Sequence, residues 1–180
     1  TLLDSYLEVG EFGKAREYIR QAQTDIDKIV PVRYCEDNAV NLILSSFAAK
    51  ARQQDVAFSA EVNIPARLTL SDTELCALLS NGLDNAVRAA AQADETPRTV
   101  RISCQPHKDK LLIYISNPYR GTVAMRDGLP QSAAAHHGYG TKSIRMIAEK
   151  HNGYCAFEAE DGLFTLKVVL PLSEEQCALA

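Results

Sequence analysis

The segment LLSNGLDNAVR, residues 78–88, constrains the fold of this chain most, because it combines an apolar helical face with two amides four residues apart. On a helical projection Asn81, Asn85 and Arg88 share one narrow face. The opposite face is apolar and holds Leu75, Leu79, Leu83, Ala86 and Ala90. Such a helix packs one side against a core and leaves the other side available to a ligand.

The polar face of this helix has two interpretations. Amide oxygens one turn apart suit a hard cation such as Mg²⁺, which keeps several waters and is usually completed by substrate phosphates. The guanidinium of Arg88 suits those phosphates. The alternative is a solvated polar stripe, which is ordinary on a surface helix. The helix alone leaves both interpretations open.

A second feature is the glycine-punctuated segment HHGYGTKSI, residues 136–144. Glycines let a backbone approach a phosphate closely, and the free N–H groups at a helix start favour anions. We expect this turn to run into an amphipathic helix with Ile144, Ile147 and Ala148, ending at Asn152-Gly153. The P-loop spacing is absent, and no hydrophobic strand precedes the turn as in a dinucleotide fingerprint.

Helices and strands fill the rest of residues 32–180. Periodicity predicts a helix at 37–54 and a strand at 56–62, and a capping box at 71–74 starts the paired-asparagine helix. Strands are expected at 99–104, 111–117, 154–159 and 164–170, the last two as a hairpin across Asp161-Gly162. The pattern predicts an α+β fold, a two-layer sandwich in which helices cover one mixed, mostly antiparallel sheet.

Residues 1–31 have a different pattern, an apolar three-then-four spacing closed by Pro31. Apolar residues at this spacing form a narrow stripe on a helix, which needs partner helices to cover it. We therefore interpret residues 1–31 as part of a dimerisation hairpin. The alternative is a hairpin that packs on its own domain. The predicted boundaries are therefore 1–31 for the hairpin and 32–180 for the main domain.

Composition narrows the class of protein. A formal charge of −4 without a basic cluster argues against nucleic acid as the main partner. Five cysteines without a CxxC pair indicate reduced thiols in a cytosolic setting. No apolar run is long enough to span a membrane. Because the chain begins at Thr1, we expect it to be a fragment, and upstream membrane segments remain possible.

Between Pro118 and His137 the sequence loses its periodicity, and a loop of this length in a compact domain is usually functional or mobile. Arg120 and Arg126 are candidate phosphate contacts, or ordinary surface residues. His137 abuts the glycine turn and is the better phosphate candidate of the two adjacent histidines, with a solvated position as its alternative.

The order of these motifs resembles the ATP-binding domain of the GHKL superfamily, which has the Bergerat-type fold. Asn81-x-Leu83-Asp84-Asn85-Ala86 looks like the N-box of sensor histidine kinases, and GYGTKS at 138–143 looks like their second glycine box. The segment Ile115-Ser116-Asn117-Pro118 and the short loop after it are most similar to the quorum-sensing, accessory-gene-regulator type of kinase.

This resemblance implies ATP and Mg²⁺ as ligands. Asn85 and Asn81 would hold the metal, and Arg88 would lie against the phosphates. The polyphosphate cradle would comprise His137, Gly138, Tyr139, Gly140 and Thr141. The family's first glycine box, with its adenine-binding aspartate, is absent, and Asn117 stands at the end of the corresponding strand; it either accepts a hydrogen bond from adenine or forms a turn before Pro118.

The implied activity is transfer of the ATP γ-phosphoryl group to a histidine on an upstream helix. Hydrolysing members of the superfamily have a glutamate base where this chain has Asn81, so hydrolysis should be slow. All four histidines lie beyond the hairpin, so the fragment should bind ATP without phosphorylating itself. The implied partners are a response regulator and a second subunit, in the cytoplasmic part of a bacterial membrane sensor.

Other functions remain open. A nucleotide-gated interaction module or pseudokinase would use the same pocket without transfer. A conformational ATPase is disfavoured by Asn81, and a serine kinase of the anti-sigma type generally lacks the hairpin.

Overall fold

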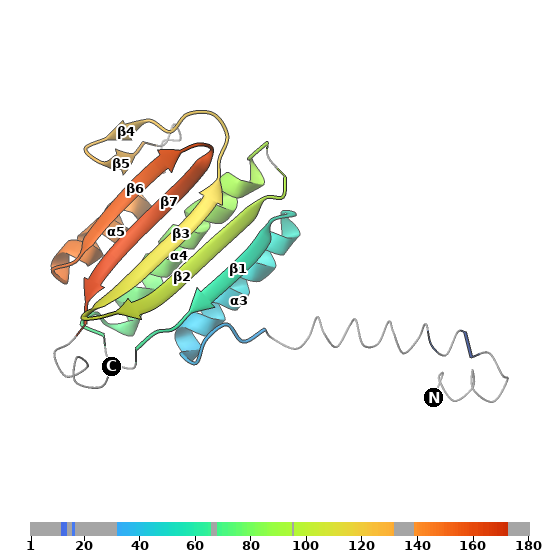
Figure 1. Cartoon of the computed structure of the whole chain (residues 1–180), viewed down its shortest axis with the longest axis horizontal. Coiled ribbons are helices and arrows are strands. Elements are labelled where there is room, and N and C mark those ends of the chain that lie inside the picture. Colours follow the sequence, from blue (N-terminus) through green and yellow to red (C-terminus); the bar gives the residue numbers. More distant parts are fainter. Residues whose placement is uncertain are drawn as a thin grey trace. The chain divides into compact units, whose positions relative to one another are not determined.

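A five-stranded sheet forms one layer of the domain in the computed structural model, with strand order β1-β2-β3-β7-β6 (Figure 1). Its strands are β1 (Ala57–Val62), β2 (Thr99–His107), β3 (Lys110–Pro118), β6 (Tyr154–Glu160) and β7 (Leu163–Pro171). Strands β1 and β2 are parallel, and the other pairs are antiparallel. In the β6–β7 turn, Asp161 and Gly162 have φ angles of 49° and 76°, as the predicted tight hairpin requires.

The structure describes residues 12, 13, 16, 32–65, 68–94, 96–131 and 139–172. The chain divides into two compact units, Thr1–Val32 and Arg33–Ala180. The predicted hairpin at 1–31 lies outside the described residues, apart from Phe12, Gly13 and Arg16, which are helical. The elements below all belong to the second unit.

Three helices cover one face of the sheet: α3 (Asn38–Gln53), α4 (Asp72–Ala91) and α5 (Tyr139–Lys150) (Figure 1). Helix α4 is central, since it packs against α3, α5, β2 and β3. One mixed sheet covered by helices is the predicted α+β sandwich, and the prediction is confirmed.

Local signals place α4. Its N-cap Ser71 and Glu74 form the predicted capping box. The predicted apolar face is fully in the core, with every side chain at most 2% exposed: Leu75, Leu79, Leu83, Ala86 and Ala90. The role of Gly82 was not predicted. A Cβ added there would lie 2.7 Å from Ile115 Cδ1 and 3.0 Å from Leu166 Cδ2. The missing side chain therefore lets α4 approach β3 and β7 closely.

The structure differs from the sequence-based expectation in three places. Strands β2 and β3 extend to His107 and back to Lys110, joined by a two-residue turn. The long loop contains a short hairpin, β4 (Met125–Arg126) with β5 (Leu129–Pro130), because two-residue strands are too short to show periodicity. Helix α5 begins at Tyr139, so Gly140 and Thr141 belong to its first turn rather than to a turn preceding it.

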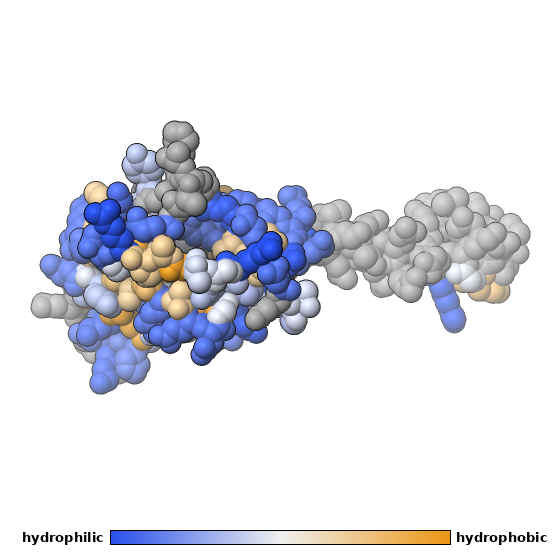
Figure 2. Space-filling view, turned by 90° about the horizontal axis from the view of Figure 1, so that it is seen from above, coloured by the Kyte–Doolittle hydropathy of each residue, from blue (hydrophilic) through white to orange (hydrophobic). Residues whose placement is uncertain are grey.

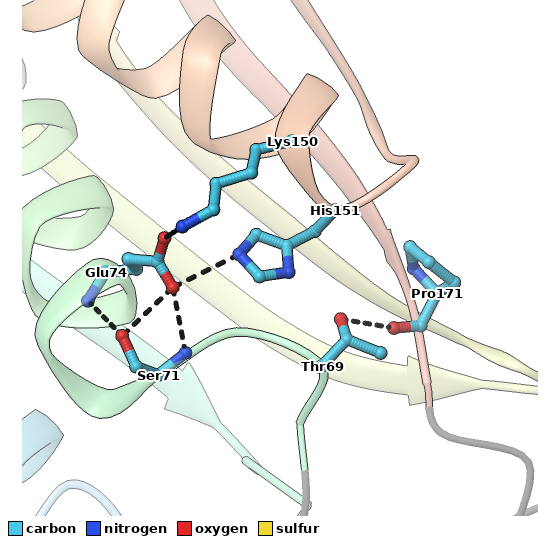
Figure 3. Close-up of polar contacts among 6 residues, drawn as sticks. All are labelled: Thr69, Ser71, Glu74, Lys150, His151 and Pro171. Atoms are coloured by element: carbon cyan, nitrogen blue, oxygen red, sulfur yellow. Dashed lines mark hydrogen bonds and ion pairs between the residues drawn. The ribbon is translucent and has the colours of Figure 1, made fainter.

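Glu74 joins the start of α4 to the end of α5 (Figure 3). Its carboxylate accepts hydrogen bonds from Lys150 Nζ at 2.7 Å and from the Ser71 backbone N–H at 3.1 Å, and lies 3.1 Å from His151 Nε2. The pKa of Glu74 is lowered to about 2, mainly by the Lys150 ammonium and next by the two hydrogen-bond donors of Ser71. This contact joins the start of α4 to the end of α5, and the start of α5 lies beside the middle of α4, where Gly140 faces Asn81.

The surface of this unit is mostly hydrophilic in the view of Figure 2, with an apolar area in its middle. Large apolar side chains at the surface include Tyr139, Met146 and Tyr154. In the described part of the chain, no helix combines the length and apolar character needed to cross a bilayer.

Candidate functional site

The two motifs singled out in the sequence meet in the structure. A Cβ added to Gly140, in the first turn of α5, would lie 3.4 Å from Asn81 Oδ1 and 3.6 Å from Asn81 Cβ and Cγ. These are ordinary contact distances across the junction between α4 and α5. The paired-asparagine face therefore borders the start of the helix that follows the glycine segment.

The polar face of α4 is partly buried at Asn81, Asn85 and Arg88. Arg88 Nη2 donates a hydrogen bond of 2.7 Å to Asn85 Oδ1. The same Nη2 lies 3.9 Å from Asp84 Oδ2. The side chain of Arg88 thus covers the amide oxygen that the sequence suggested as a metal ligand.

Lys50 of α3 is a residue at this site that the sequence did not reveal. Its Nζ forms an ion pair with Asp84 Oδ1 at 2.5 Å and lies 5.6 Å from the centre of the Phe47 ring. The Asp84 carboxylate therefore has a lysine on one oxygen and an arginine near the other. Nothing local predicts this pair, because it depends on how α3 packs against α4.

Asn117 is buried, with 1% of its surface exposed. Like Ile113 and Ile115, it lies on the buried side of β3. Its Nδ2 donates a 2.8 Å hydrogen bond to the Pro118 carbonyl. The other amide atom, Oδ1, is an acceptor. Asn117 lies within strand β3, paired with Phe164 of β7, rather than in a turn before Pro118.

The end of β3 lies at the same end of the domain as the last turns of α4. Arg98, just before β2, donates a 3.1 Å hydrogen bond to the carbonyl of Ala91 at the end of α4. Arg101 of β2 pairs with Ser116, next to Asn117. Gly82 of α4 lies against Ile115 of β3. From this contact both elements run toward the same end of the domain, so Asn85 and Asn117 both lie on that side of it.

The remaining candidates are distributed as follows. Thr141 is buried and Tyr139 is exposed at the start of α5. His136, His137 and Gly138 lie outside the described residues. Arg120 pairs with Asp94 at 3.2 Å and Arg126 lies 3.8 Å from Asp127, and all four side chains are strongly exposed. These contacts do not bring either arginine to the polar face of α4.

Two surface pockets, of about 360 and 410 Å³, lie elsewhere. The smaller is lined by the chain before α3 and the end of β1, and the larger by α5, β6 and Gly128. Neither has Asn81 or Asn85 in its lining. We place the candidate site by the convergence of side chains, since a ligand site is defined by its donors and acceptors rather than by volume alone.

These donors and acceptors fit a magnesium-bound polyphosphate. The described residues contain no group of three or more His, Cys, Asp or Glu side chains that could hold a metal on its own. Two amide oxygens suit a hard cation that takes its other ligands from water and phosphate. Arg88 and the N–H groups at the start of α5 suit the phosphates, and Asn117 Oδ1 suits an amino group.

Comparison with known proteins shows the family to which the chain belongs. A family model described as a GHKL domain matches residues 70–171, more than half of the chain. No curated protein shows a significant match to this chain.

Solved structures share the fold. The nucleotide-free catalytic domain of histidine kinase ThkA has a TM-score of 0.60 at 17% identity, covering 76% of this chain and 92% of that one. The histidine kinase AdeS of Acinetobacter baumannii has a TM-score of 0.56 at 14% identity, covering 96% and 85%. The blue-light activated histidine kinase EL346 of Erythrobacter litoralis has a TM-score of 0.54 at 13% identity, covering 76% and 62%. The chain belongs to the GHKL domain family, with the fold of histidine kinase catalytic domains.

Proposed function

We propose that this chain is the ATP-binding catalytic domain of a two-component sensor histidine kinase, which transfers the γ-phosphoryl group of ATP to a histidine on an upstream helix. The observation that carries the proposal is the contact between Gly140 and Asn81. It brings an amide pair and a helix N-terminus to one place, and a metal-bound triphosphate needs both.

Each residue has a role in this proposal. Asn85 and Asn81 offer oxygens to Mg²⁺. When bound, this ion would neutralise part of the phosphate charge. Arg88 and the N–H groups at the start of α5 bind phosphate oxygens, and His137 and Gly138 complete the cradle. Asn117 accepts a hydrogen bond from the adenine amino group. Positioning and charge neutralisation of this kind are most of what phosphoryl transfer requires from a protein.

Asn81 also shapes the reaction. An amide cannot take a proton from water, so Asn81 cannot act as the base of a hydrolase. A neutral imidazole nitrogen needs no base to attack a phosphorus atom, so transfer to histidine remains efficient. This argues against a conformational ATPase.

The finer assignments extend the proposal. Asn117 before Pro118, with no first glycine box, supports the accessory-gene-regulator type and a quorum-sensing role. A response regulator and a cytoplasmic position in a membrane sensor follow from the assignment as a sensor histidine kinase. The apolar pattern of residues 1–31 supports a homodimer formed through that hairpin. A pseudokinase that binds nucleotide without transfer is the second candidate, because neutral Asn117 gives a weaker hydrogen bond than a carboxylate would.

Titration with Mg-ATP tests the proposal. The wild-type chain should give a saturable signal in calorimetry. Asn85→Ala should weaken binding by about tenfold or more, because it removes a ligand to a charged group. Gly140→Ala should also weaken binding, since its methyl group would fill the space beside Asn81 Oδ1.

Asn63→Ala is the matched control, because Asn63 is an exposed asparagine just after β1. It should bind like the wild type. A wild-type chain that shows no saturable binding of Mg-ATP, or an Asn85→Ala variant that binds as well as the Asn63→Ala control, would contradict the proposed site.

A further inference from the structure

Arg88 and a metal ion compete for the same atom. The side chain of Asn85 offers one oxygen to a hard cation, because its amide nitrogen is a donor and not a ligand. In the structure this oxygen accepts the 2.7 Å hydrogen bond from Arg88 Nη2. We infer that Arg88 blocks the metal position in the nucleotide-free protein, so that the site binds a divalent cation only together with a phosphate group. The inference rests on the proposed function for the identity of the ligand.

The competition is electrostatic. A guanidinium keeps its positive charge at every pH at which a protein is folded. Arg88 has 39% of its side chain exposed, so solvent screens its charge only in part. A divalent ion at Asn85 Oδ1 would lie within a few ångströms of this charge. Arg88 must therefore leave the oxygen before a metal can bind there.

Asp84 and Lys50 explain why Arg88 contacts a neutral amide rather than the neighbouring carboxylate. Arg88 Nη2 is 2.7 Å from Asn85 Oδ1 but 3.9 Å from Asp84 Oδ2. The Asp84 carboxylate already has an ion pair with Lys50, which reduces its attraction for a second cation. Lys50 is thus a positioning residue that keeps Arg88 on Asn85.

A phosphate group removes the block. Guanidinium and phosphate form paired, charge-assisted hydrogen bonds that are stronger than a bond to a neutral amide. When phosphate binds Arg88, Asn85 Oδ1 becomes free for the cation that accompanies the phosphate. By linkage, metal and phosphate should each strengthen binding of the other, and free metal should bind weakly.

Electron paramagnetic resonance of free Mn²⁺ tests this directly, without measuring catalysis. Mn²⁺ is titrated into the protein without nucleotide and again with ATP. We expect the wild type to bind Mn²⁺ poorly without ATP. Arg88→Met should bind Mn²⁺ alone about tenfold more tightly, which is the effect of removing one hydrogen bond to a charged group. The same variant should bind ATP more weakly than the wild type.

Arg101→Met is the matched control, because it removes the same charge from the exposed face of β2, opposite the helices. It should bind Mn²⁺ like the wild type. The double variant Arg88→Met/Asn85→Ala should lose the gain in Mn²⁺ binding, which assigns that gain to the amide oxygen. Equal Mn²⁺ affinities of Arg88→Met and Arg101→Met would overturn the inference, even if ATP binds the wild type normally.

Lys50→Met tests the positioning role. Without Lys50, the Asp84 carboxylate should attract Arg88 away from Asn85, and Mn²⁺ alone should bind more tightly than in the wild type. If Lys50 acts through Arg88, adding Lys50→Met to Arg88→Met should give little further gain, whereas independent effects would add. Full additivity would overturn the role of Lys50. A wild type that binds no ATP would instead refute the proposed function, while the comparison of Mn²⁺ alone would still decide the block at Asn85.

Discussion

Gly82 shows how one missing side chain positions the amide pair. Glycine inside a helix costs about 0.5–1 kcal/mol relative to alanine. The structure explains its presence, because a Cβ at this position would lie 2.7 Å from Ile115 Cδ1. The neighbouring Asn81 and the following Asn85 therefore depend on a close approach of α4 to the sheet.

Replacing Gly82 by alanine should destabilise the fold by about 1 kcal/mol, the balance of overpacking at 1–3 kcal/mol and improved helix propensity. Ile115→Val removes the Cδ1 atom that the new methyl group would meet. In a double-mutant cycle measured by urea unfolding, Gly82→Ala/Ile115→Val should therefore be more stable than the sum of the single changes predicts. Simple additivity would show that this contact does not restrict position 82.

Cys104 is fully buried, and its burial makes the thiol unreactive. The sequence indicated reduced thiols, and the four described cysteines are free. Burial raises the pKa of the Cys104 thiol to about 12. A thiol in this state has almost no thiolate at neutral pH and is therefore inert in the folded protein.

At the scale of elements, the contact between α4 and α5 decides whether the two motifs meet. The sequence predicted both helices and the capping box. It did not predict that Glu74 of the capping box also binds Lys150 and lies next to His151 at the other helix. The residues are far apart in the chain, and their proximity follows from the antiparallel packing of α4 and α5.

This contact predicts a pH dependence of stability. The pKa of Glu74 falls from 4.5 to about 2 on folding, so the folded state favours the ionised carboxylate. Its contribution is complete above about pH 4.5 and is lost as pH falls toward about 2. Glu74→Gln keeps the side-chain acceptor of the capping box but removes the charge. It should lower Tm at pH 7, and the difference from the wild type should shrink on acidification.

Thermal unfolding by circular dichroism between pH 7 and pH 2 measures this difference. Glu61→Gln removes a carboxylate that is exposed on β1, and it serves as the control that should follow the wild type. A constant gap in Tm between Glu74→Gln and the wild type across this range would show that the charge of Glu74 does not stabilise the contact.

For the molecule as a whole, the positions of the two histidines that the structure describes, His107 and His151, restrict the activity. His151 is only 13% exposed at its side chain and lies against Glu74, and His107 ends β2 at the β2–β3 turn. Neither is on a helix that could present an acceptor to the α4 face. Because all four histidines also follow the predicted hairpin at 1–31 in the sequence, we expect the chain to bind ATP but to show no detectable autophosphorylation by radiolabelled ATP, and to phosphorylate a supplied upstream helix in a mixed dimer. Strong labelling of the chain alone would contradict this placement.

Most helices and strands, and much of their burial, could be predicted from local pattern, because these features depend on periodicity and caps. The apolar face of α4, the capping box, the β6–β7 turn and the α+β class were all predicted and are confirmed. The start of α5 and the β4–β5 hairpin were not, since glycines and very short strands leave no periodic signal.

The polar groups that lie together could not be predicted in this way, because they come from different helices. Gly140 meets Asn81, Lys50 pairs with Asp84, and Glu74 binds Lys150. Each of these contacts joins residues on different helices, and its distance is set by how closely three helices pack on one sheet. That distance depends on the fit of side chains such as Ile115 against Gly82, which no pattern within a single helix or strand contains.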